Sequence, residues 1–254
     1  MLAPERHKII LSELEERGNV SVKELKAKLK VSQDTVRRDL ELLEQSGKLQ
    51  RVHGGAALKE DSATNRVFML RKITHLERKQ ELAAVAAQLT KENQAVALNA
   101  GTTNIEVAKQ LAARFDRLTV LTNSIKVAEV LAVKRNFTVI LLGGTLNHDE
   151  FSLYGATIPQ ELARFNIDMV FIAINAISLD KGLTDFRQGE AEVINAMVQS
   201  ASRKVVVADS SKFETVSYLN VCGFDAIDAI VTDAMLDSET RRLYENRSIT
   251  IFQP

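Results

Sequence analysis

Residues 31–56 of the chain, VSQDTVRRDLELLEQSGKLQRVHGGA, contain the pattern that determines the fold of its N-terminal part. Ser32 is a suitable helix N-cap, because its hydroxyl can accept a hydrogen bond from a free backbone N–H of the first turn. Val36, Leu40 and Leu43 follow at spacings of four and three residues, which place them on one buried face of a helix. A Ser-Gly pair then ends the helix. The pattern therefore predicts an amphipathic helix followed by a short extended segment.

The opposite face of this helix is polar and carries two adjacent arginines, Arg37 and Arg38. Successive residues of an α-helix point about 100° apart, so the two guanidinium groups cannot share one partner. On DNA, one of them would contact a base edge and the other a phosphate. The extended segment adds Lys48, Arg51 and His53. An ordinary solvated helix face explains these charges equally well, so the choice depends on the residues that precede the helix.

Two further helices are predicted before this one. The first covers residues 5–18, ERHKIILSELEERG, and ends at a glycine. The second opens with Ser21 and Glu24, the Ser-x-x-Glu spacing of a capping box. A winged helix-turn-helix has this order of elements: two helices, a tight turn, a third helix with a basic outer face, and a short basic strand. This order favours DNA binding over a merely solvated face.

The segment from Arg6 to Ala56 resembles the DeoR family of bacterial transcriptional regulators, through the pattern R…I…L…G…V.V.EL…L.VS.DTVRRDL..LE..G.L.R.HGGA. The resemblance implies a DNA-binding domain over residues 1–57, a linker over 58–74, and an effector and oligomerisation domain over 75–254. The candidate DNA-binding residues are Ser32, Gln33, Thr35, Arg37, Arg38, Arg51, His53, Gly54 and Gly55.

Composition limits the other classes of function. The 254 residues include 33 Lys and Arg and 33 Asp and Glu, so the formal net charge is zero. Positive charge must therefore be concentrated by the fold, and we expect DNA binding to need a multimer. Cys222 is the only cysteine, which excludes an intrachain disulfide and fits a reducing cytoplasm. No signal segment, membrane span, metal-ligand spacing or nucleotide-binding motif is recognisable, so we expect a cytoplasmic protein without cofactor or metal.

The rest of the chain alternates short apolar strands with helical patterns. The predicted strands are 95–100, 118–123, 138–144, 168–175, 204–210, 229–233 and 248–252, and the helical patterns between them are 104–114, 125–134, 157–164, 189–201 and 238–246. Strands that are apolar throughout are typical of a parallel sheet covered on both faces. The predicted fold class is α/β, with an N-terminal winged helix-turn-helix joined to a mostly parallel, Rossmann-like α/β domain.

Polar residues follow several of these strands, and ligands of such sheets bind beyond the carboxyl ends of the strands. Gly101-Thr102-Thr103 combines a turn, two hydroxyls and a helix N-terminus, which suits an anion such as phosphate. Lys212 follows the fifth strand beside two serines and could neutralise a phosphate. Helix capping or a surface lysine explains each feature alone, but together they favour a phosphorylated small molecule. The candidate effector-binding residues are Asn99, Gly101, Thr102, Thr103, Asn104, Thr122, Asn123, Gly143, Gly144, Asp209, Ser211 and Lys212.

The resemblance to the DeoR family extends over this region as well. It rests on Gly101-Thr102-Thr103, Thr122-Asn123, Gly143-Gly144, Gly182-Leu183-Thr184, the acidic stretch from Glu190 to Glu192, and Asp209 to Phe213. It implies a sugar-phosphate-sensing domain similar in fold to ribose-5-phosphate isomerase and the CoA transferases. It also implies a repressor of a sugar-catabolic operon that a phosphorylated sugar releases from its operator.

Three places depart from the family pattern. Asn99 stands where aspartate is common, Ala173, Asn175 and Ala176 replace usual glycines, and Ile194 replaces a frequent lysine. The loss of a carboxylate and an ammonium near the expected pocket would change which sugar fits, or whether the response is induction. The sugar and the sign of regulation therefore stay open.

Two other hypotheses compete with a regulator. One is a sugar-phosphate isomerase or transferase with an appended DNA-binding module, in which Glu190, Glu192, Asp185 or Asp209 acts as general base. Acidic residues at helix starts are also ordinary complements of the helix dipole, and no spacing selects one of the four. The other is an architectural DNA-binding protein whose second domain only oligomerises. We expect a regulator without enzyme activity, which binds double-stranded operator DNA as a homodimer or homotetramer.

Overall fold

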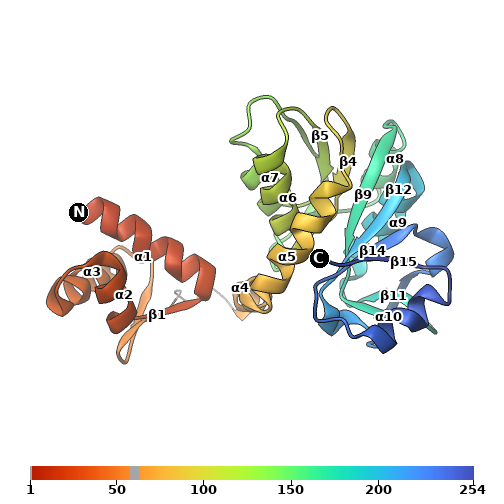
Figure 1. Cartoon of the computed structure of the whole chain (residues 1–254). Helices are drawn as coiled ribbons and strands as arrows, with labels where there is room; N and C mark the ends of the chain where they lie inside the picture. The colour runs from red at the N-terminus through yellow and green to blue at the C-terminus, as the bar shows by residue number, and fades with distance from the viewer. Residues whose placement is uncertain (1, 58–62) are drawn as a thin grey trace. The chain divides into compact units, whose positions relative to one another are not determined.

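A computed structural model describes residues 2–57 and 63–254 of the chain. The chain divides into two compact units, Met1–Thr74 and His75–Pro254 (Figure 1). Residues 58–62, the first part of the predicted linker, lie outside the described residues.

The first unit is a winged helix-turn-helix, as predicted. It consists of the helices α1 (Ala3–Arg17), α2 (Val22–Leu29) and α3 (Gln33–Gln45), and the strands β1 (Asn19–Ser21), β2 (Gln50–Val52) and β3 (Gly55–Ala57). The strands form an antiparallel sheet in the order β1-β3-β2. A fourth helix, α4 (Ala63–Ile73), packs against α1.

Local sequence signals explain where these helices begin. Ser21 and Glu24 form the predicted capping box, since the Ser21 hydroxyl accepts from the Glu24 N–H at 3.2 Å and the Glu24 carboxylate accepts from the Ser21 N–H at 3.0 Å. The Ser32 hydroxyl accepts from the Thr35 N–H at 3.2 Å and caps α3. The predicted stripe of Val36, Leu40 and Leu43 is buried in one core with Ile10, Leu14, Val20, Val22, Leu25, Leu29, Leu49 and Ala56.

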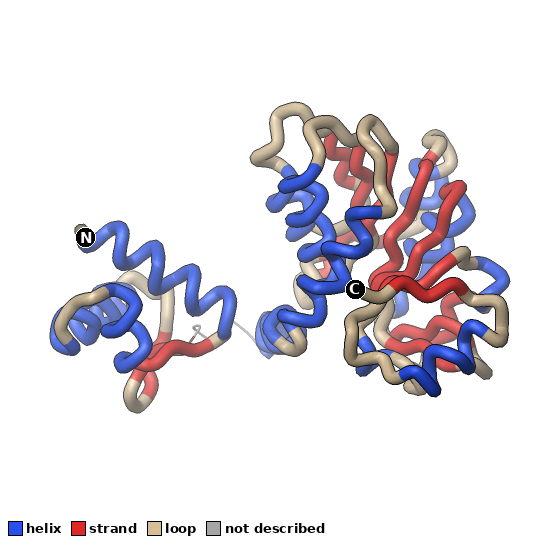
Figure 2. Tube along the Cα trace, viewed as in Figure 1, coloured by secondary structure: helices blue, strands red, loops and turns tan. Residues whose placement is uncertain are grey.

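The second unit is built on a seven-stranded sheet with the order β15-β14-β12-β9-β4-β5-β6, in which all pairs are parallel. Its strands, red in Figure 2, are β4 (Ala95–Leu98), β5 (Thr119–Thr122), β6 (Thr138–Leu141), β9 (Ile167–Ala173), β12 (Ala201–Val207), β14 (Ala229–Val231) and β15 (Thr250–Phe252). The seven predicted strands are these seven, and the predicted fold class is confirmed.

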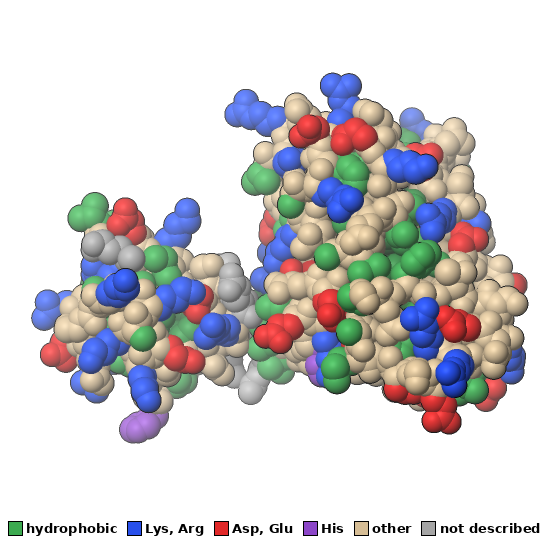
Figure 3. Space-filling model, viewed as in Figure 1, with side chains coloured by type: hydrophobic (Ala, Val, Ile, Leu, Met, Phe, Trp, Pro, Cys, Tyr) green, Lys and Arg blue, Asp and Glu red, His purple; other side chains and the backbone are tan. Residues whose placement is uncertain are grey.

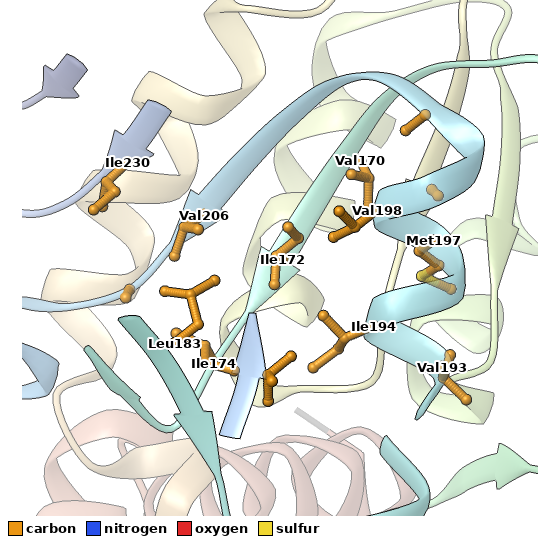
Figure 4. Close-up of a cluster of buried hydrophobic side chains, with 14 of the residues drawn as sticks. Val170, Ile172, Ile174, Leu183, Val193, Ile194, Met197, Val198, Val206 and Ile230 are labelled. Atoms are coloured by element: carbon orange, nitrogen blue, oxygen red, sulfur yellow. The ribbon is translucent and has the colours of Figure 1, made fainter. Parts of the chain in front are cut away.

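Helices cover both faces of this sheet. They are α5 (Leu76–Gln88), α6 (Thr102–Arg114), α7 (Ile125–Leu131), α8 (Thr157–Leu162), α9 (Gln188–Ser200) and α10 (Ser238–Glu245). One face carries Val170 and Ile172 of β9, which pack against Ile194 and Val198 of α9 (Figure 4). Complete burial of each such side chain stabilises the fold by about 1.5–3 kcal/mol. Ile194 is therefore a core residue, and its departure from the family pattern changes packing instead of the charge of a pocket.

Short elements that the sequence analysis did not predict lie beyond the strands. They are the antiparallel sheet of β10 (Ala176–Ser178), β11 (Gly182–Asp185) and β13 (Leu219–Cys222), the hairpin of β7 (Thr145–Asn147) and β8 (Ser152–Tyr154), and the 3₁₀ turns η1 (Ser210–Lys212) and η2 (Phe224–Ala226). Each has three or four residues, too few for a periodic pattern. Among the described residues, no helix is long and apolar enough to cross a membrane.

Candidate DNA interface and effector site

The outer face of α3 presents the predicted recognition residues to solvent. Gln33, Arg37 and Arg38 are exposed and Thr35 is half-buried. Arg37 lies 3.9 Å from Asp34, measured from Nη1 to Oδ1, and such an exposed pair contributes little. Arg38 forms no ion pair with any described residue. Both guanidinium groups are therefore available to a partner, and basic side chains also stand out on the face of the first unit shown in Figure 3.

Asp39, in the middle of α3, fixes the recognition helix to α1. Asp39 is 3% exposed, and its carboxylate accepts hydrogen bonds from Nε and Nη2 of Arg6 at 2.6 and 2.9 Å. The His7 ring lies 3.1 Å from the same carboxylate. Burial alone would raise the pKa of Asp39, but the hydrogen bonds and charges of Arg6 and His7 outweigh it and hold that pKa below its usual value. The ion pair thus sets how α3 lies on α1.

Contacts with α3 and pairing with β1 attach the wing to the rest of the first unit. Glu44 of α3 accepts from the backbone N–H and from Nε of Arg51, both at 2.8 Å. A Cβ at Gly55 would lie 2.0 Å from the carbonyl oxygen of Val20, so only glycine lets β3 pair this closely with β1. His53 is exposed at the turn. Contact of Arg51, His53 and the glycines with DNA stays a prediction, since Arg51 is paired with Glu44.

Beyond the strand ends of the second unit, a buried network surrounds Glu190 at the start of α9. One oxygen, Oε1, accepts from Asn99 Nδ2 at 3.0 Å and from the Ala100 N–H at 2.9 Å. The other, Oε2, accepts from Asn123 Nδ2 at 3.0 Å. Burial raises the pKa of Glu190, against the opposing effect of the Arg187 charge and the two amides. This carboxylate joins the ends of β4 and β5 to α9.

Asn99 also connects β4 to β9. Its Oδ1 accepts from the Ala173 N–H at 2.7 Å and from Asn104 Nδ2 at 3.0 Å. An aspartate at this position, the residue common in the family pattern, would place a second carboxylate against Glu190 in this network. Four predicted effector residues, Asn99, Asn104, Thr122 and Asn123, are fully buried. They hold the loops, and their direct contact with an effector stays a prediction.

Gly101 and the two threonines that follow it form the start of α6. A Cβ at Gly101 would lie 2.6 Å from the Ala173 Cβ, so the close approach of β9 requires glycine. As the N-cap residue, Gly101 has no side chain to accept from the first-turn N–H groups. Thr102 and Thr103 are 8% and 9% exposed. An anion placed here would accept from the N–H groups at this end of the helix.

Lys212 lies in η1, after β12. The turn is shaped by Asp209, whose carboxylate accepts from the Ser211 N–H at 3.1 Å, and by Asp233, which accepts from the Ser210 N–H at 2.7 Å. Lys212 is half-buried and forms no ion pair within the described part of the chain. Of the predicted residues in this loop, Lys212 is the uncompensated positive charge, while Asp209 holds Ser211.

Strand order determines which of these loops one small ligand can reach. Strands β4 and β12 flank β9, so their carboxyl ends, which lead into the loops of Gly101 and Lys212, lie two strand spacings or about 10 Å apart. Gly143 and Gly144 follow β6, four spacings or about 19 Å from β12. The Gly143 N–H donates to Glu161 at 3.1 Å, and a Cβ at Gly144 would lie 2.5 Å from the Tyr154 carbonyl oxygen. Strand order therefore places the end of β4, before Gly101, two spacings from both the end of β12 and the end of β6, and it places the Gly-Gly pair farthest from the Lys212 loop.

A buried arginine beneath this site was not predicted from the sequence. Arg187 donates to both oxygens of Asp185 at 2.8 and 2.7 Å, and its Nη1 donates to the Ala100 carbonyl at 2.8 Å. Glu150 lies 3.6 Å from the same Nη1. Arg187 thus holds the backbone just before Gly101. No sequence spacing relates it to that loop, since only the fold brings residues 87 positions apart together.

A winged helix-turn-helix unit followed by a parallel α/β unit with a polar site at the strand ends defines a class of two-domain DNA-binding regulators. Residues 6–62 match the family described as DeoR-like helix-turn-helix domain, and residues 74–234 match the DeoR C terminal sensor domain. The chain belongs to the DeoR family of transcriptional regulators.

Individual proteins resemble the chain over most of its length. It is 34% identical to the HTH-type transcriptional regulator GlpR of Haloferax volcanii, over 99% of this chain and 98% of the relative. It is 32% identical to the glycerol-3-phosphate regulon repressor of Escherichia coli K12, over 92% of each. Among solved structures, ribose 5-phosphate isomerase A of Methanocaldococcus jannaschii matches with a TM-score of 0.40 and 15% identity over 53% of each chain.

Proposed function

We propose that the chain is a sequence-specific transcriptional repressor of a sugar-catabolic operon, released from its operator by a phosphorylated sugar. The observation that carries the proposal is the presence, in one chain, of a recognition helix with two available arginines and a sheet edge with an uncompensated lysine beside a helix N-terminus. The E. coli relative, named a glycerol-3-phosphate regulon repressor, supports a phosphorylated effector. A repressor acts at the chromosome, so we place the chain in the cytoplasm.

In this proposal, α3 enters the major groove. Arg37 and Arg38 point in different directions, so one reads a base edge and the other contacts a phosphate, with Gln33 and Thr35 beside them. His53 at the wing contacts the DNA backbone or the minor groove. One copy presents few positive charges, so a homodimer or homotetramer would bind two half-sites related by a dyad.

The effector site lies over the end of β9, between the loops that follow β4 and β12. The phosphate would accept from the first turn of α6 beside Thr102 and Thr103, and Lys212 would neutralise its charge. The strand ends that lead into these two loops are about 10 Å apart, which a phosphorylated sugar can span. Asn175, which donates to the Ser217 hydroxyl at 2.6 Å, follows β9 between them and would face the sugar.

The same geometry argues against an isomerase. A general base needs access to a substrate proton. Of the four candidate bases, Glu190, Asp185 and Asp209 are 3%, 0% and 1% exposed, and their oxygens accept from groups of the protein. The fourth, Glu192, is exposed to solvent on α9. We therefore propose that the chain has no enzyme activity, and turnover of ribose 5-phosphate by the purified protein would overturn this.

Fluorescence anisotropy with DNA from upstream of the chain's own gene tests the proposed function. The titration is run over a salt series, with and without a panel of sugar phosphates. Tight, salt-dependent binding that one sugar phosphate reverses is expected. Tight binding that no sugar phosphate alters would reject the proposed effector site while leaving the DNA interface intact.

A further inference from the structure

Helix α5 holds two of the loops beyond the strand ends through its side chains. Arg78 Nη1 donates to the Ser210 hydroxyl at 3.2 Å, and Glu81 accepts from the Ala234 N–H at 3.2 Å. The two loops are joined, because the Ser210 N–H donates to Asp233 at 2.7 Å. A displacement of the loop that carries Lys212 would therefore change the hydrogen bonds that hold α5 in place.

The same helix packs on α6, whose first residue is Thr102 (Figure 1). Leu82, Ala83 and Ala86 of α5 are fully buried. Small side chains let the helices approach closely, and close-packed contacts transmit displacement instead of absorbing it. The proposed effector site lies between the start of α6 and the loop after β12. Helix α5 thus contacts both α6 and this loop.

The N-terminal end of α5 is the start of the second unit. Helix α4 ends at Ile73 and α5 begins at Leu76, so two residues connect the helices. One of them, His75, has φ 55° and ψ 34°, a left-handed conformation that residues with a Cβ seldom adopt. Arg78 lies in the first turn of α5. This turn is therefore joined to the DNA-binding unit by a connection of only two residues.

We propose that the Arg78–Ser210 hydrogen bond holds α5 in the position that permits operator binding, and that a ligand at the loop of Lys212 releases the operator by breaking it. This inference rests on the proposed function. Arg78 is a positioning residue here and not a phosphate ligand, because Glu214 and Asp237 line the depression beside it. Their negative charges would oppose a bound phosphate.

The test is the operator affinity of Arg78→Gln in the intact chain without any effector. Loss of the hydrogen bond should mimic the ligand and weaken operator binding by about 5- to 150-fold, the usual range of coupling between two sites. Ser210→Ala, which removes the other partner and no charge, should weaken it similarly. The double variant should be no weaker than either single variant, because both remove one interaction.

Arg114→Gln is the matched control, since Arg114 is exposed in the last turn of α6 and the substitution removes the same charge. It should bind the operator as the wild type does, and all variants should keep the wild-type melting temperature. Operator affinity of Arg78→Gln and Ser210→Ala equal to that of the wild type would overturn the proposal, as would additive losses in the double variant. Failure of every sugar phosphate to release the wild type would reject the proposed function separately, because these affinities are measured without effector.

Discussion

Because Asn99 contacts the carboxylate of Glu190, we expect the stability of an Asn99→Asp variant to depend on pH. In Asn99→Asp, two carboxyl groups would face each other where Asn99 Nδ2 now lies 3.0 Å from Glu190 Oε1, and both side chains are buried. Two carboxylates at this separation cannot both ionise, so the pair would retain one proton at neutral pH. In the unfolded variant, the introduced carboxyl group would titrate near the ordinary aspartate pKa of about 3.9.

The cost to stability follows from that difference in pKa. The carboxyl pKa is higher in the folded variant than in the unfolded variant. The variant therefore keeps its full stability below the pKa of the unfolded state, and it loses stability as pH rises towards the pKa of the folded state. At about 1.4 kcal/mol per pH unit, Asn99→Asp should lose about 1.5 kcal/mol relative to wild type at pH 5 and as much as about 4 kcal/mol at pH 7. Above the raised pKa the loss should stop growing.

Urea unfolding of the second unit at several pH values measures this loss. Asn136→Asp is the matched control, because Asn136 is exposed and the same substitution should leave stability nearly unchanged. Adding Glu190→Gln to Asn99→Asp removes one carboxylate and should recover much of the loss above pH 6. A loss for Asn99→Asp that does not depend on pH, or no loss at pH 7, would refute the account of the Glu190 network.

Three further predictions concern the two proposed sites. Arg37→Ala and Arg38→Ala should each weaken operator binding. One should cost about 1–3 kcal/mol and relax the base preference, and the other should reduce by about 1 the slope of log affinity against log salt concentration. Unchanged anisotropy titrations for both variants would place the DNA-reading face elsewhere. Lys212→Ala should keep operator affinity and lose release by the sugar phosphate, and release at wild-type effector concentration would disprove its role. The lowered pKa of Asp39 stabilises the first unit above the ordinary carboxyl pKa, and this contribution is lost as pH falls through the folded pKa. The protection factors of the α3 amides, which are corrected for the intrinsic exchange rate at each pH, should therefore fall in acid for wild type. Asp39→Asn should show lower protection factors already at pH 7.

Much of the fold follows from local sequence signals. Three predicted features of the first unit are present: the Ser32 cap, the Ser21–Glu24 capping box, and the buried stripe that includes Val36 and Leu40. The seven strands of the parallel sheet are predictable because each is apolar on both faces. Short strands such as β1 and β10 escape prediction, because three residues carry no periodicity.

The candidate effector site is harder to predict, since a strand-end amide looks the same in sequence whether it faces a ligand or the protein. Asn99 and Asn123 face Glu190. Arg187 contributes to the loop at Ala100 from a distant segment, and no local pattern signals that contact. Ile194, interpreted from the sequence as a change near a pocket, lies in the core. These are consequences of tertiary packing, which a single sequence does not encode locally.

In the proposed function, operator DNA and a phosphorylated sugar each lower the affinity of the chain for the other. Isothermal titration of the releasing sugar phosphate into the protein, free and saturated with operator DNA, measures this antagonism. Because linkage is reciprocal, effector affinity should fall on the DNA complex by the same factor by which the effector lowers operator affinity. Equal effector affinity in the two titrations would contradict the proposed function.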